Sequence, residues 1–155
     1  TNADAHCALA DTYMKDKEYD KAILEYQKAS QLVPDNESVL IKLGNAYKAK
    51  SETKNALDMY QKVIFKNLKN TDAMFNAGLC YAELNDNNNA IKSFKNVIAI
   101  DPNYAYAYYA LGMAYENEKN YPESIANYEK FMTLTDDNET KAQVKNQIEY
   151  LKNKK

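Results

Sequence analysis

The sequence is short of several residue types, and each shortage argues against a class of protein. All 20 basic residues are lysine, so the chain lacks arginine, the residue best suited to gripping phosphates and carboxylates. The 22 acidic residues bring the formal net charge to −2, a balance that argues against nucleic acid or an anionic membrane surface as partner. No apolar run approaches the roughly 20 residues that span a bilayer, so we expect no direct membrane insertion.

Histidine and cysteine are also scarce, which leaves little material for catalysis or for metal binding. His6 is the single histidine, and its neighbour Cys7 makes only a weak metal signal, set against a plain position on a helix. Cys7 and Cys80 do not make a disulfide framework, and Cys80 is expected to be a buried thiol. No nucleophile–base pair and no glycine-rich phosphate loop can be assembled. The sequence therefore predicts a protein without enzyme activity, cofactor or metal.

Glycine and proline, the two helix breakers, number three each, which favours helix throughout the chain. One stretch, NYAYAYYALGMAY at 103–115, disagrees at first sight. Its tyrosines at 104, 106 and 108 alternate with alanines, which is the period of a β-strand. The local pattern alone leaves strand and helix open, and the rest of the chain decides between them.

The chain repeats itself at a step of 34 residues. One column holds only tyrosine, and a second holds only small residues. A third is aromatic throughout. The columns are Tyr13, Tyr47, Tyr81 and Tyr115; Ala10, Gly44, Gly78 and Gly112; and Tyr26, Tyr60, Phe94 and Tyr128. A fixed period in the range of about 20–50 residues is typical of a solenoid.

The register predicts four units, each with two helical stretches separated by turn sequences such as LNDNNN. The units are residues 3–36, 37–70, 71–104 and 105–138. Residues 139–155 follow as a capping helix, with an expected inner stripe of Ala142, Val144, Ile148 and Leu151. In this register the tyrosine-rich stretch becomes the first helix of the fourth unit. Its alternation is the overlap of two helical stripes.

This pattern resembles the tetratricopeptide repeat, a 34-residue helix–turn–helix unit. The residues that carry the resemblance are Gly78, Tyr81, Ala90, Phe94 and Pro102, with Gly112 and Tyr115 in the next unit. The chain departs from the family pattern in having no tryptophan, and Ser124 stands where alanine is usual. The resemblance implies an all-α fold, a right-handed superhelical solenoid of four units plus the capping helix. It also implies that the first helices line an inner, concave groove.

The register assigns an apolar and aromatic strip with two asparagines to this groove. The expected groove residues are Ile41, Asn45, Phe75, Asn76, Leu79, Tyr106, Tyr109 and Met113. Exposed apolar surface marks partner sites, and asparagine can hydrogen-bond a peptide backbone in both directions. We therefore expect an adaptor that holds a peptide or helix segment of a partner protein. Tyrosine and asparagine are also common at such positions in the family, and the capping helix or another copy could cover part of the strip.

Two further functions remain open: a structural scaffold that self-assembles through the groove or through the uncapped N-terminal end, and a plain spacer. Binding of acidic chaperone tails is disfavoured. Asn45 and Asn76 match the two amides of the known clamp, but Ile41, Tyr106 and Ala110 stand where cations are needed. The chain begins at Thr1 without methionine, so we expect a trimmed sequence. The cytoplasm is the favoured compartment, with the periplasm as the alternative if a signal segment was removed.

Overall fold

The computed structural model describes residues 2–154, which form α-helices joined by short connections, with no strand among them. The helices are α1 (Asn2–Lys15), α2 (Tyr19–Leu32), α3 (Glu37–Ala49), α4 (Thr53–Lys66), α5 (Thr71–Glu83), α6 (Asn87–Ile100), α7 (Ala105–Asn117), α8 (Tyr121–Leu134) and α9 (Asn138–Lys152). None of these helices combines the length and the apolar character needed to cross a membrane. The predicted all-α repeat fold is confirmed, and the strand-like tyrosine stretch is α7.

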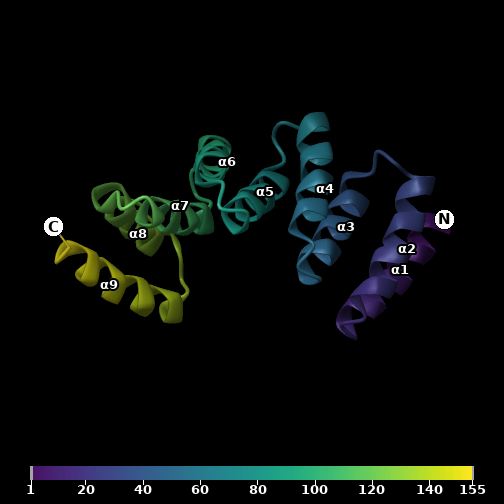
Figure 1. Cartoon of the computed structure of the whole chain (residues 1–155), viewed down its shortest axis with the longest axis horizontal. Coiled ribbons are helices and arrows are strands. Elements are labelled where there is room, and N and C mark those ends of the chain that lie inside the picture. Colours follow the sequence, from purple (N-terminus) through teal and green to yellow (C-terminus); the bar gives the residue numbers. More distant parts are fainter. Residues whose placement is uncertain (1, 155) are drawn as a thin grey trace. The chain divides into compact units, whose positions relative to one another are not determined.

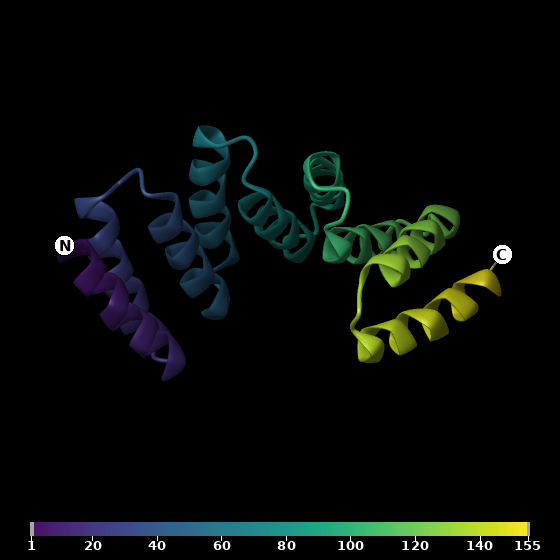
Figure 2. The same cartoon turned by 180° about the vertical axis from the view of Figure 1, so that it is seen from behind.

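Packing divides the chain into two compact parts, Thr1–Cys80 and Tyr81–Lys155, called here the N-terminal part and the C-terminal part. In the N-terminal part α1 packs on α2, α2 on α3, and α3 on α4. In the C-terminal part α6, α7, α8 and α9 pack in succession. Figures 1 and 2 show these neighbouring helices from opposite sides. The division falls inside α5, and the boundaries of the four 34-residue units stay a prediction.

The turns between paired helices repeat in structure as well as in sequence. Each turn has one residue with a left-handed backbone, at Lys17, Ser51, Asn85 and Lys119, with φ of 60 to 64°. The following amide then donates a hydrogen bond back to the tyrosine column, as from Glu18 to the Tyr13 carbonyl at 2.8 Å. Asn120 bonds the Tyr115 carbonyl in the same way at 2.9 Å. The step of 34 is therefore a step between equivalent turns.

Small residues let paired helices approach closely, as the register predicts. A Cβ atom added to Gly112 on α7 would lie 2.6 Å from ring carbons of Tyr128 on α8. The same atom on Gly44 of α3 would lie 2.8 Å from Cε1 of Tyr60 on α4. Ser124, which replaces the usual alanine, is fully buried and donates its hydroxyl to the Gly112 carbonyl at 2.8 Å. The buried hydroxyl is thereby satisfied.

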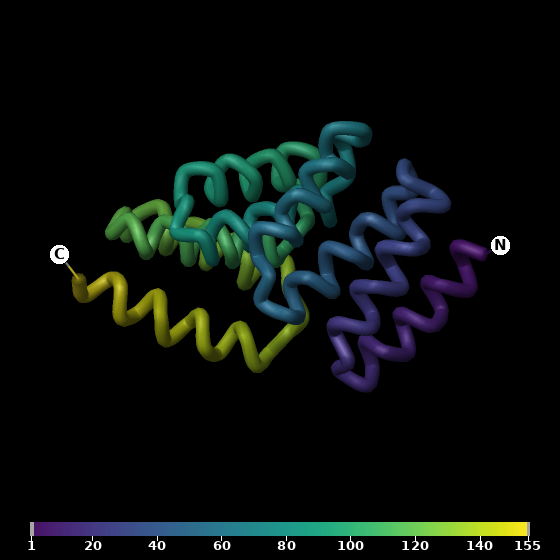
Figure 3. The backbone as a smooth tube through the Cα atoms, turned by 45° about the vertical axis from the view of Figure 1, so that its right-hand side comes forward, coloured from purple at the N-terminus to yellow at the C-terminus, as the bar shows by residue number. Residues whose placement is uncertain are grey.

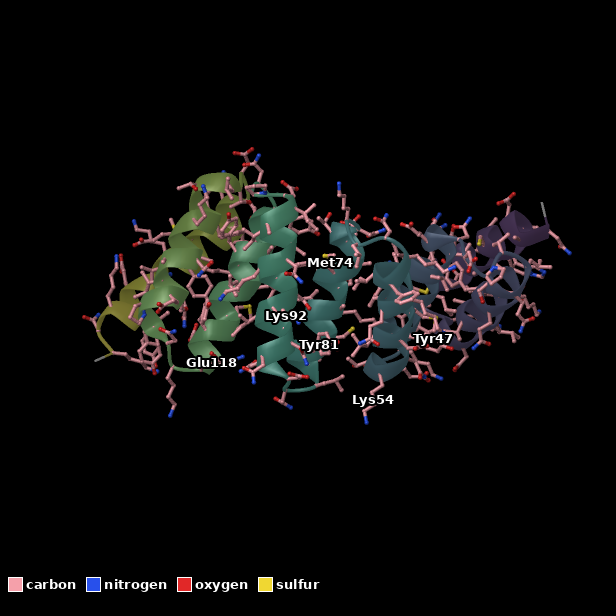
Figure 4. The ribbon with its side chains drawn as sticks, turned by 90° about the horizontal axis from the view of Figure 1, so that it is seen from above. Tyr47, Lys54, Met74, Tyr81, Lys92 and Glu118 are labelled. Carbon is pink, nitrogen blue, oxygen red and sulfur yellow. The ribbon has the colours of Figure 1, made fainter. Side chains whose placement is uncertain are left out.

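Contacts between successive pairs use the second helix of one and the first helix of the next. Gln27 on α2 donates from Nε2 to the hydroxyl of Tyr47 on α3 at 2.8 Å. Leu43 on α3 joins Tyr26 of α2 in one buried cluster. Figure 4 labels Tyr47 on α3, and it shows Lys54 of α4 directed away from the ribbon. A hydrogen bond and a buried apolar cluster thus join α2 to α3.

The capping helix closes the apolar face of the C-terminal part. The chain leaves α8 through an extended segment at 135–137 and then enters α9, as Figure 3 shows. Asp137 caps α9 by accepting hydrogen bonds from the amides of Glu139 and Thr140. The buried residues of α9 are Val144, Ile148 and Leu151, in one cluster with Tyr128 and Phe131. The predicted inner position of Ala142 is wrong: it is exposed, because residues two apart on a helix face different directions.

The thiols behave as the sequence predicts. Cys80 is completely buried, and within residues 2–154 neither cysteine forms a disulfide. Cys7 is half-buried on α1.

Candidate peptide-binding groove

Five of the eight predicted groove residues belong to the N-terminal part. Ile41 is half-buried and packs against the cluster of Leu40, Val63 and Ala73. Phe75 and Leu79 are half-buried on α5. These side chains therefore contribute to packing as well as offering apolar surface.

The two asparagines are oriented by the protein itself. Asn45 is exposed on α3, and its Oδ1 accepts the hydroxyl of buried Tyr60 at 2.6 Å. This bond aims the amide nitrogen, a donor, away from the tyrosine. Asn76 donates from Nδ2 to the Asp72 carbonyl at 2.9 Å, which directs its amide oxygen outward. Fixed amides can offer one donor and one acceptor, and their binding of a peptide stays a prediction.

Three predicted groove residues belong to α7 in the C-terminal part. The side chains of Tyr106 and Met113 are among the most exposed apolar groups there, at 46% and 47%. The Tyr106 ring lies 5.7 Å from the Phe131 ring, and its hydroxyl donates to Asp137 at 3.2 Å. That hydrogen bond to a carboxylate raises the pKa of Tyr106. Tyr109 is half-buried, with its ring 5.2 Å from that of Phe131.

A cavity of about 300 Å³ opens beside this face of α7. It is lined by Tyr109, Met113, Glu116 and Asn117 of α7, Tyr128 of α8, and Gln143, Val144 and Gln147 of α9. Two of the predicted groove residues, Tyr109 and Met113, thus share one cavity. The capping helix supplies its far wall and does not cover Met113.

Glu116 is the charged group of this cavity. Its Oε2 accepts the hydroxyl of Tyr128 at 3.1 Å, and its Oε1 accepts the Nε2 group of Gln147 at 2.6 Å. Burial, together with the charge of Glu116, raises the pKa of Tyr128, so that the phenol stays a neutral donor. Both donors are therefore neutral, and the carboxylate is held in place without being neutralised.

An acid at an inner position of the N-terminal part has a different environment. Asp11 on α1 also accepts a tyrosine hydroxyl, from Tyr26, but its second oxygen pairs with Lys42 at 2.7 Å. Partial burial acts to raise the pKa of Asp11, but the hydrogen bonds from Lys42 and Tyr26 outweigh it and hold that pKa below its ordinary value. Asp11 is thus neutralised within the chain.

The single histidine makes a close polar contact with a buried carboxylate of the neighbouring helix. His6 Nδ1 lies 2.6 Å from Oε2 of buried Glu25, and Lys28 donates to the other oxygen at 2.7 Å. Burial raises the pKa of the adjacent Cys7 thiol, which is opposite to the shift that activates a nucleophile. Within residues 2–154 no group of three or more His, Cys, Asp or Glu side chains is placed to hold a metal ion.

Sequence reasoning missed the part of this site that α8 and α9 contribute. Tyr128 was expected only as a member of the aromatic column, and Gln147 was not among the expected site residues. A signal was present: Tyr26 and Tyr60 each bond a polar residue 15 positions earlier, but Tyr128 has Met113 at that position. Its acceptor had to come from elsewhere, and Glu116 lies one helical turn beyond Met113.

The comparisons with solved structures agree on the fold. A crystal structure of MamA protein matches with a TM-score of 0.86 at 23% identity, covering 97% of this chain and 82% of that chain. A second MamA crystal structure matches with a TM-score of 0.81 at 27% identity, over 92% and 81% of the two chains. MamA 41-end from Desulfovibrio magneticus RS-1 matches with a TM-score of 0.82 at 18% identity, over 98% and 96%.

The comparisons with sequences identify the family. No protein of curated function has a sequence that matches this chain. Residues 10–51 and 78–119 match the family model described as TPR repeat, and residues 105–138 match the model of the tetratricopeptide repeat. The first model alone accounts for more than half of the chain. The chain therefore belongs to the tetratricopeptide repeat family, and this membership supports a role in protein interaction or as a scaffold.

Proposed function

We propose that this chain is an adaptor that binds a peptide or short helix of a partner protein on the inner faces of its first helices. The observation that carries the proposal is the exposure of Tyr106 and Met113 at 46% and 47%, with Met113 also lining a cavity. Tyrosine brings a large contact area with a polar tip, and methionine adapts its shape to different partners. Such a surface is better suited to binding a peptide than to catalysis.

The fixed amides of the N-terminal part support the same function. Asn45 and Asn76 each have one end held by the protein, at 2.6 Å and 2.9 Å. A held amide loses little conformational entropy when it bonds a peptide backbone. Exposed apolar side chains supply contact area for the peptide, and oriented amides bond its backbone and so fix its register.

The test is a selection of displayed random dodecapeptides on the immobilised chain. Peptides enriched on the wild type should bind at least about tenfold more weakly to the double variant Tyr106→Ala, Met113→Ala. Each of the two substitutions removes contact area at an exposed site. The matched control is Phe65→Ala with Leu24→Ala, which removes exposed apolar groups from the second helices α4 and α2. Equal binding by both double variants would contradict the proposal. Unchanged melting temperatures establish that each variant is folded.

A second candidate function, self-assembly through the N-terminal end, rests on one face of α1. Leu9 is 44% exposed, whereas its register equivalents Leu43 and Leu111 are 3% and 4% exposed. Leu43 is covered by residues of the preceding helix α2. A helix from another copy could cover Leu9 in the same way.

Light scattering across a range of concentrations distinguishes the two functions. Self-assembly requires the mean mass to rise with concentration, and Leu9→Glu should abolish the rise because it places a charge in an apolar contact. Leu24→Glu, at a site 51% exposed on α2, is the matched control. A constant monomer mass would remove this candidate and leave the adaptor.

A further inference from the structure

The cavity between α7, α8 and α9 combines an unneutralised carboxylate with aromatic walls. Glu116 accepts hydrogen bonds from two neutral donors, the Tyr128 hydroxyl and the Gln147 amide. Among residues 2–154, no lysine nitrogen lies within 4.0 Å of this carboxylate. The contrast with Asp11, which pairs with Lys42 at 2.7 Å, shows that an inner-facing acid of this chain can be neutralised internally.

One lysine acts on Glu116 from a distance. The ammonium of Lys154 lies 4.4 Å from the centre of the Tyr150 ring and 5.8 Å from that of Tyr121. A hydrogen bond with Tyr150 is the main reason that the pKa of Lys154 is raised, and the charge of Glu116 is the smallest. Lys154 is thus engaged with two rings and is no direct counter-ion for the cavity.

The walls suit the hydrocarbon stem of a long cationic side chain. The rings of Tyr109 and Tyr128 lie 5.9 Å apart, tilted by 44°. Met113, which is exposed, and Val144 of α9, which is buried, both line the cavity. Aromatic faces attract ammonium and guanidinium groups, and thioether and valine surfaces accept methylene groups. The volume of about 300 Å³ is at the lower limit for small-molecule sites, so it suits one side chain rather than a whole ligand.

Neutral amides complete the polar lining. Asn117, Gln143 and Gln147 all border the cavity. Gln147 donates its Nε2 group to Glu116, which aims its amide oxygen elsewhere. Amide oxygens can accept the N–H bonds of a cation that the carboxylate leaves unused. A neutral or anionic ligand would instead leave Glu116 without a partner charge.

We propose that this cavity receives one lysine or arginine side chain of the bound peptide, with Glu116 as its counter-ion. The inference rests on the proposed adaptor function and adds the chemistry of its ligand. The cation displaces no internal ion pair, because Glu116 has none. A hydrogen bond to a charged group contributes more than one between neutral groups, so this pocket fixes the register of the peptide on α7.

The experiment selects displayed random dodecapeptides in parallel on the wild type, on Glu116→Gln and on Glu118→Gln. Glutamine keeps an oxygen that can accept from Tyr128 but removes the charge. Glu118, labelled in Figure 4, follows the last residue of α7 and is exposed outside the cavity, so it is the matched charge control. Peptides enriched on the wild type and on Glu118→Gln should share a lysine or arginine at one position. That preference should vanish on Glu116→Gln.

A second measurement does not depend on the stability of any variant. In the enriched peptide the shared lysine is replaced by norleucine, or the shared arginine by citrulline. Each replacement should weaken binding to the wild type by about tenfold or more. The same replacement should change the affinity for the Glu116→Gln variant only slightly. Raised salt should weaken only the binding of the cationic peptide to the wild type.

The outcomes separate the two levels of the proposal. Enriched peptides without a shared cation, bound equally by the wild type and Glu116→Gln, would overturn the pocket assignment and leave the adaptor function standing. If no peptide were enriched on the wild type, the adaptor function would fail, and the pocket assignment with it.

Discussion

Tyr60 donates its hydroxyl to Oδ1 of Asn45 at 2.6 Å, across the pair α3 and α4 and over a sequence separation of 15 residues. Tyr26 and Asp11 form the same bond across α1 and α2. In the third repeat both positions are apolar in the sequence, Phe94 and Leu79. In the fourth repeat Met113 stands at the acceptor position, and the Tyr128 hydroxyl donates to Glu116 instead. Each phenol of this column therefore has an acceptor, because a buried hydroxyl without one costs free energy.

The first prediction concerns this pair. Asn45→Leu should lower the free energy of unfolding by about 1 kcal/mol, because the Tyr60 hydroxyl loses this acceptor. Tyr60→Phe should cost about as much by itself. The double variant imitates the third repeat and should lose less than the sum of the two. Urea unfolding of all four proteins measures the coupling, and additivity within about 0.5 kcal/mol would show that the bond contributes nothing.

The second prediction concerns the close approach of α7 and α8. Gly112→Ala places a Cβ atom 2.6 Å from the ring of Tyr128, which is 2% exposed and cannot move aside freely. Overpacking costs about 1–3 kcal/mol, and the better helix propensity of alanine offsets about 1 kcal/mol of it. We expect a net loss of stability by thermal melting. Ala126 is exposed on α8, so Ala126→Gly measures the effect of helix propensity alone and is the control. If Gly112→Ala were more stable than the wild type, helices α7 and α8 would be able to move apart.

The third prediction concerns the left-handed residues of the turns. Lys119 has φ of 60° and Ser51 has φ of 64°, a region that suits glycine or asparagine better than lysine or serine. Lys119→Gly and Ser51→Gly should each stabilise the protein by about 0.5–1 kcal/mol. Asn85 is already suited to this conformation, so Asn85→Gly should change little. The shifts in urea midpoint test this, and a destabilised Lys119→Gly would contradict it.

The fourth prediction concerns acid. The pKa of Asp11 lies below its ordinary value in the folded chain, because hydrogen bonds from Lys42 and Tyr26 outweigh burial. Its stabilising effect is therefore complete above the unfolded pKa of about 3.9 and is lost as the pH falls through the lower folded value. Asp11→Asn should reduce the loss of stability between about pH 5 and pH 2.

The expected difference for Asp11 is small, since its side chain is 42% exposed and screened by solvent. Other carboxylates with lowered pKa values, such as Glu25 and Asp137, still make the stability of the variant fall as the pH is lowered. Urea midpoints at several pH values measure the effect. Asp16→Asn, at the exposed turn after α1, is the matched control, and an equal effect of both variants would exclude a specific role for Asp11.

The sequence by itself determined the helices, their pairing and the family. Tyrosines and small residues recur at a step of 34 residues, which marks equivalent positions in successive helix pairs. Because side chains three or four residues apart share a face of a helix, these positions indicate which faces pack together. The same register indicated that Cys80 is buried and that Tyr106 and Met113 are exposed, as they are. These are properties of one helix and its immediate neighbours, and local periodicity encodes them.

Only the tertiary structure decided which polar groups find partners. Asn45 and Asp11 occupy equivalent positions and each accepts a tyrosine hydroxyl, but Lys42 from the next first helix also pairs with Asp11. Glu116 contacts Tyr128 of α8, and the placement of α9 brings Gln147 to the same carboxylate. Hydrogen bonds depend on distances of a few tenths of an ångström between atoms of different helices, and a one-dimensional pattern does not contain such distances.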